Sequence, residues 1–105
     1  MTVNDIIKLM PSGLNTVATA DMKSSIQFDI SKPMYLLIDH GTCSAHEGVV
    51  DAPDVALTMA DEDLKAMLKG ELNGAMAFMS GKLKLKGDMM LAQRIPSLFD
   101  ASKIS

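Results

Sequence analysis

The amino-acid order is most informative between Ala77 and Leu91, where the chain runs AFMSGKLKLKGDMML. Between its two glycines, Lys and Leu alternate strictly. Successive side chains of a strand point to opposite sides, so we expect the three lysines on one face and Leu83 and Leu85 on the other. The stretch therefore predicts a short strand over residues 82–86, wet on one side and apolar on the other, with Met-rich segments at both ends.

Composition restricts the possible functions. The chain has 105 residues, a net charge of -3, ten methionines, four aromatic residues and a single cysteine, Cys43. The negative charge argues against general nucleic-acid binding, which relies on a basic surface. One cysteine permits no internal disulfide and fits a reducing compartment. We see no signal peptide, no apolar stretch near the roughly 20 residues of a membrane span, and no peroxisomal tripeptide at the end. We therefore expect one domain over residues 1–105 and a cytoplasmic location.

Periodicity predicts an α+β fold. Strands precede the long helices, which favours a largely antiparallel sheet. The nearly all-apolar run from Met34 to Asp39 is expected to be a central strand covered on both faces. Asp61, Asn73 and Asp88 are the expected N-caps of the later helices. The expected strands are 25–30, 34–39, 43–50, 54–59 and 82–86, and the expected helices are 3–10, 14–20, 61–69, 75–79 and 89–94, with a break at Pro96.

Polar residues with catalytic or metal-binding potential are sparse. His40, Cys43, His46 and Glu47 lie close in sequence, but positions three apart on a strand face opposite sides. A Cys43–His46 nucleophile pair also lacks an orienting third group. We therefore expect no enzyme activity, no metal and no cofactor. The lysine face of the 82–86 strand is either a plain solvated surface or a contact for an anionic membrane.

The apolar residues carry the functional signal. Six methionines, at positions 59, 67, 76, 79, 89 and 90, lie within about 30 residues on the helix faces that would cover the sheet. Methionine is flexible and adapts to apolar partners of different shape. An apolar pocket under the helices fits this pattern. Ordinary core packing fits it as well.

Three blocks of sequence resemble the sterol carrier protein 2 (SCP-2) family. They are DVALTMADEDL (54–64), LKGELN (68–73) and AFMSGKLKLKGD (77–88), and their order and spacing match over about residues 24–95. The resemblance implies a five-stranded, largely antiparallel sheet covered on one side by helices, with an apolar tunnel between them. Family members bind fatty acids, acyl-CoA, sterols or phospholipids and carry them without transforming them.

Residues that are expected to face the space between the sheet and the helices are the candidate ligand-binding residues of the tunnel. They are Phe28, Leu36, Met59, Leu64, Met67, Leu68, Met76, Phe78, Met79, Leu83, Leu85, Met90 and Ile95. The implied partner is a lipid, with transient membrane contact and a homodimer as further expectations.

The chain departs from the family pattern at two points. Ser80 stands where animal members have Gln before Gly-Lys, which removes an amide from the head-group region. The N-terminal helix is short, which would widen a tunnel mouth or expose it for dimerisation. Together with the absent peroxisomal ending, this resembles a single-domain bacterial-type member. An accessory protein that presents a prenyl or quinone lipid to a partner enzyme is the alternative function.

Overall fold

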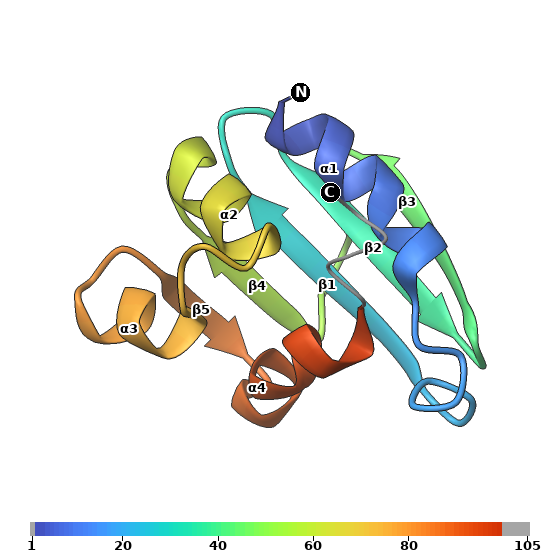
Figure 1. Ribbon diagram of the computed structural model, residues 1–105. Coiled ribbons are helices and arrows are strands. Elements are labelled where there is room, and N and C mark those ends of the chain that lie inside the picture. Colours follow the sequence, from blue (N-terminus) through green and yellow to red (C-terminus); the bar gives the residue numbers. More distant parts are fainter. Residues whose placement is uncertain (1, 100–105) are drawn as a thin grey trace.

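The computed structural model describes residues 2–99, apart from the side chain of Pro96. A five-stranded sheet carries all the helices on one face (Figure 1). The elements are α1 (Val3–Leu9), a 3-10 turn (Met10–Gly13), β1 (Lys23–Asp29), β2 (Met34–Asp39), β3 (Thr42–Glu47), β4 (Val55–Thr58), α2 (Asp61–Leu68), α3 (Gly74–Met79), β5 (Lys84–Gly87) and α4 (Met89–Leu98).

The strand order is β3-β2-β1-β4-β5. β1 pairs with β4 in parallel, and every other pair in this sheet is antiparallel. The α+β class and the largely antiparallel five-stranded sheet are thus confirmed. The parallel pair requires the connection from β3 to β4 to pass across β2 and β1.

The central strand is β1, so the prediction of β2 as a strand covered on both faces was wrong. In β2, Met34, Leu36 and Ile38 are buried but Leu37 is exposed. In β1, by contrast, Gln27 is only 1% exposed although it points away from the helices. The crossover loop covers it. The Gln27 amide donates to the Gly48 carbonyl at 3.2 Å, and its oxygen accepts from the Val50 N–H at 2.8 Å.

Local signals place most helix ends. Thr2 and Asp5 form a capping box at α1, and the Asp88 carboxylate accepts from the Met90 and Leu91 N–H groups at the start of α4. The predicted cap of α2 was wrong: Ala60 occupies that position. The Asp61 carboxylate instead accepts from the Ser31 N–H and hydroxyl, far away in sequence.

Further differences from prediction concern residues 14–20 and the ends of three elements. Residues 16–21 form turns, where a helix over 14–20 was predicted. The Asn15 side chain accepts from the Val17 and Ala18 N–H groups as an N-cap would, but after the single Thr19 N–H to Asn15 carbonyl bond the following bonds span only three residues. α4 runs through Pro96 and ends at Leu98. β5 begins at Lys84, two residues later than predicted, and β3 ends at Glu47.

Candidate functional site

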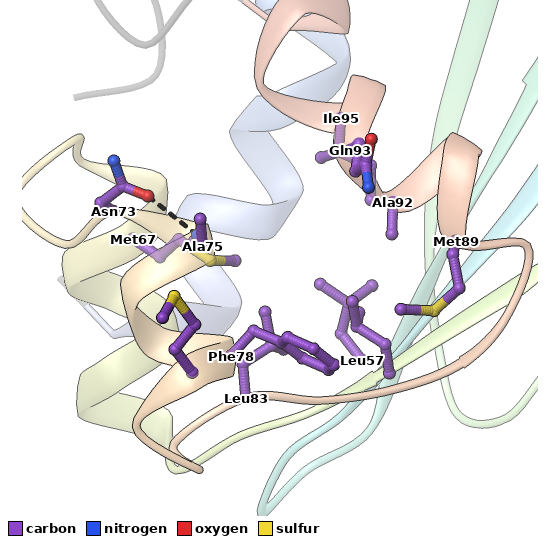
Figure 2. Close-up of a pocket in the computed structure, with 13 residues that line it drawn as sticks. Leu57, Met67, Asn73, Ala75, Phe78, Leu83, Met89, Ala92, Gln93 and Ile95 are labelled. Atoms are coloured by element: carbon purple, nitrogen blue, oxygen red, sulfur yellow. Dashed lines mark hydrogen bonds between the residues drawn. The ribbon is translucent and has the colours of Figure 1, made fainter.

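An apolar cavity of about 390 Å³ lies between α3, α4 and the β4–β5 side of the sheet; we call it the α3–α4 cavity. In Figure 2, Phe78 on α3 and Met89 on α4 extend toward one another, with Leu57 between them and Leu83 beside Phe78. The cavity is lined by Leu57, Met67, Asn73, Gly74, Ala75, Phe78, Met79, Leu83, Leu85, Met89, Ala92, Gln93 and Ile95.

The position of the cavity follows from which helices cover which strands of the sheet. α1 lies over the β2–β3 side (Figure 1), where its Ile6 and Ile7 are completely buried. The β4–β5 side is covered instead by α4 and the short α3, which contribute Gly74, Ala75 and Ala92. Such small side chains leave space that Leu or Phe would occupy. α1 does not line the cavity, so its shortness does not widen this entrance.

The electrostatics of the cavity are simple. None of the residues lining it in the described part of the chain carries a charge. Its polar groups are the amides of Asn73 and Gln93. The Asn73 oxygen accepts from the Ala75 N–H at 2.8 Å (dashed in Figure 2) and from the Met76 N–H at 3.4 Å, so it caps α3. The interior therefore suits an apolar chain and offers no counter-charge to an ionised group.

The predicted ligand-binding residues separate into three groups. Six lie along the cavity: Met67, Phe78, Met79, Leu83, Leu85 and Ile95. Five are packed in the hydrophobic core and do not line it: Phe28, Leu36, Met59, Leu64 and Leu68. Met76 and Met90 are 63% and 75% exposed and do not line it. Contact of any of them with a ligand stays a prediction.

Sequence reasoning missed seven lining residues: Leu57, Asn73, Gly74, Ala75, Met89, Ala92 and Gln93. The alternation in the strand predicted over 54–59 places Leu57 on the inward face, so this residue could have been selected. Met89 is adjacent to the selected Met90, so the helix facing was wrong by one position. The small residues matter because they leave space, and a search for large apolar side chains does not select them.

The polar residues of β3 do not assemble a second site. Cys43 pairs with Ile38 and packs against the core, whereas His46 pairs with Tyr35 and stacks on its ring at 5.1 Å on the other face of the strand. Burial raises the pKa of Cys43 to about 11 and keeps it protonated. Within residues 2–99, no group of three or more His, Cys, Asp or Glu is placed to hold a metal ion. The same residues contain no helix long and apolar enough to span a bilayer.

Comparisons with known proteins find relatives in sequence and solved structures with the same fold. Human stomatin-like protein 1 is 33% identical over 97 residues, which cover 86% of this chain and 24% of that protein. The structure of palmitated SCP2L2 from Aedes aegypti superposes with a TM-score of 0.67 at 26% identity, covering 90% of this chain and 91% of that one. The sec-alkylsulfatase Pisa1 from Pseudomonas sp. shares the fold over 87% of this chain and 15% of its own (TM-score 0.79, 18% identity).

The match to a family model covers more of this chain than the matches to the long relatives do. The matched segment spans only 24% of human stomatin-like protein 1 and 9% of rat hydroxysteroid dehydrogenase-like protein 2, so the likeness covers a small part of each of these proteins. The model of the SCP-2 sterol transfer family, however, matches residues 3–100. This match covers nearly the whole chain and agrees with the observed sheet and helices, and it shows that the chain belongs to the SCP-2 sterol transfer family.

Proposed function

We propose that this protein carries lipids without transforming them, and that it holds a fatty acyl, acyl-CoA, sterol or phospholipid tail in the α3–α4 cavity. The observation that carries the proposal is the 390 Å³ apolar cavity without a charged lining residue. Membership of a lipid-transfer family and the palmitated state of the related Aedes protein support it. We further propose that residues 1–105 act as one lipid-binding domain.

The energetics favour an occupied cavity. At about 24 cal/mol per Å³, an enclosed empty void of 390 Å³ would cost about 9 kcal/mol. Water reaches the entrance, where Met79 is 83% exposed, so this value is an upper limit. It is still comparable with the whole stability of a small domain, about 5–15 kcal/mol. Each buried CH₂ of a ligand contributes about 0.8 kcal/mol, so a tail replaces the missing contacts.

The flexible walls explain broad ligand selection. Met67, Met79 and Met89 line the cavity, and unbranched methionine side chains repack around tails of different shape. A charged head group has no partner inside. We therefore propose that the tail enters and the head group stays at the entrance.

The test is to identify the lipid and to block its site. Native mass spectrometry and solvent extraction of the purified protein should reveal bound lipid, and added palmitoyl-CoA should raise the melting temperature of the delipidated protein. Ala92→Leu should lower palmitoyl-CoA affinity at least tenfold because it fills the cavity. Ala20→Leu, in an exposed turn, is the size-matched control.

The outcomes separate the candidate functions. No extracted lipid and an unchanged melting temperature would refute the carrier proposal. An isoprenoid extract together with a co-purifying enzyme would favour the accessory protein that presents a prenyl or quinone lipid. Equal affinity of Ala92→Leu and Ala20→Leu would place the ligand outside the cavity.

A further inference from the structure

Gln93 brings a polar amide to the otherwise apolar wall of the α3–α4 cavity. The other amide of this wall belongs to Asn73, whose oxygen accepts from the Ala75 and Met76 N–H groups and is therefore used in capping α3. The Gln93 side chain, by contrast, makes no hydrogen bond to any other residue in the described range 2–99. Its two N–H donors and its carbonyl oxygen are free to bind a ligand.

The position of Gln93 on α4 explains why it borders the cavity. The helix buries Leu91 in the hydrophobic core. Gln93 lies four residues after Met89, so the two side chains project from the same face of the helix, and both line the cavity. In Figure 2, Met89 lies with Phe78 at the lower end of the cavity, and Gln93 lies at the upper end. Gln93 is also exposed, so its amide lies at the edge of the cavity and not in its interior.

The chemistry of this wall selects the polar end of a ligand. A neutral amide donates to a carbonyl oxygen and accepts from a hydroxyl group. An ionised carboxylate that leaves water needs a cation as its partner, and none of the lining residues in the described part of the chain carries a charge. A plain hydrocarbon offers the amide no partner. The favoured ligand therefore joins an apolar tail to an uncharged hydrogen-bonding group.

The volume of the cavity limits the tail. At about 30 Å³ per methylene group, similar to the volume of a water molecule in the liquid, a cavity of about 390 Å³ holds roughly a dozen carbons. This is one tail of moderate length and not two. Its polar end would then lie at the edge of the cavity, where Gln93 is.

We propose that Gln93 is a specificity-determining residue. Its amide hydrogen-bonds an uncharged oxygen at the head of a single tail, such as an ester or thioester carbonyl or a hydroxyl, and the protein prefers such lipids to ionised fatty acids. The proposal rests on the proposed carrier function, because it concerns a ligand in the same cavity. Burial of the tail provides most of the affinity, and one placed polar group distinguishes between polar ends.

The experiment compares three probes with ten carbons: 1-decanol, 1-chlorodecane and decanoate at pH 8. Their affinities for delipidated protein are measured by displacement of Nile red, whose own affinity is determined first for each variant. The test variant is Gln93→Met, which keeps the length of the side chain and removes its hydrogen-bonding groups. The control is Arg94→Met, because Arg94 is the next residue of the same helix, does not line the cavity and donates to Met22 Sδ at 3.8 Å. Circular dichroism checks that the variants are folded.

The expected results distinguish the polar ends. The parent protein should bind 1-decanol more tightly than decanoate. Gln93→Met should weaken 1-decanol binding about fivefold, the effect of one hydrogen bond, and leave 1-chlorodecane binding unchanged. Arg94→Met should match the parent for both probes. Gln93→Lys should strengthen decanoate binding at least threefold, because its ammonium group pairs with the carboxylate.

Several outcomes would overturn the proposal. Unchanged 1-decanol affinity in Gln93→Met, or a loss equal to that for 1-chlorodecane or to that in Arg94→Met, would show that the amide does not bind the polar end. Tighter binding of decanoate than of 1-decanol by the parent would refute the preference for uncharged lipids. Absence of binding of all three probes to the parent would refute the carrier function itself, and the role of Gln93 with it.

Discussion

The glycines on either side of the lysine strand provide the sharpest test of the fold. Gly81 and Gly87 both have positive φ, +82° and +103°. They differ in their surroundings. A Cβ added at Gly81 would meet no atom within 4 Å, whereas a Cβ added at Gly87 would lie 2.4 Å from the Asp54 carbonyl oxygen and 3.1 Å from the Val55 Cα. We therefore predict that Gly87→Ala is much more destabilising than Gly81→Ala.

The magnitudes follow from these contacts. A positive φ costs an L-residue about 1–2 kcal/mol, and the loss of chain entropy in the unfolded state returns about 0.4–1 kcal/mol. Gly81→Ala should thus cost about 1 kcal/mol. At Gly87 the backbone of Asp54 must also move. The Asp54 oxygen accepts from the Asp88 N–H at 2.8 Å, so a bond of about 0.5–1.5 kcal/mol is endangered, and overpacking adds about 1–3 kcal/mol.

Gly87→Ala should therefore cost about 3 kcal/mol in total, with the melting temperature about 15 °C lower, against about 5 °C for Gly81→Ala. Urea unfolding followed by circular dichroism measures both values in delipidated protein. Equal denaturation midpoints with equal slopes would refute the steric argument. A folded Gly87→Ala protein should also bind palmitoyl-CoA less tightly, because β5 and the start of α4 frame the cavity.

Three other predictions concern residues away from the cavity. Gln27→Leu should cost about 1–3 kcal/mol in urea unfolding, because the half-buried Gly48 carbonyl and Val50 N–H lose their partner. A loss below about 0.5 kcal/mol would show that these bonds do not stabilise the crossover loop. Hydrogen bonds from Ser31 hold the pKa of Asp61 below its ordinary 3.8. Its contribution to stability is therefore present above about pH 3.8 and lost as the pH falls through the lowered pKa. The parent should exceed Asp61→Asn in urea midpoint at pH 6, and this excess should shrink as the pH falls below 3.8, while a constant difference would contradict this. Cys43, with its pKa at about 11, should react with a disulfide reagent at pH 8 at least 100-fold more slowly than in urea, and equal rates would show that the thiol is accessible.

Local rules predicted much of the secondary structure. Asn73 and Asp88 cap helices as predicted, because a side-chain oxygen reaches the free N–H groups of its own helix. Asp61 has the same chemistry but binds Ser31, thirty residues away. A distant hydrogen-bond partner is invisible to a rule that considers neighbours only.

The candidate site was predicted in part. Leu83 and Leu85 lie along the cavity, as the alternation of the lysine strand suggested, and so do Phe78 and Met79 from the predicted 75–79 helix. The residues of β1 and β2 do not, although they face the same side of the sheet. The two groups differ in the helices and side chains that pack on them. Periodicity predicts which side of the sheet a residue faces, but it does not predict what packs against that residue.

The sequence by itself determined most element types, the α+β class and the resemblance to the family, because helix and strand periods, caps and the spacing of three sequence blocks can all be read along the chain. Tertiary structure decided which strands pair and where space remains. The parallel pairing of β1 with β4 sends a loop over Gln27 and buries it. α1 fills one side of the sheet, and the small residues of α3 and α4 leave the other side open as a cavity. Both outcomes depend on contacts between distant segments, whose free energy is set by packing and not by the order of neighbouring residues.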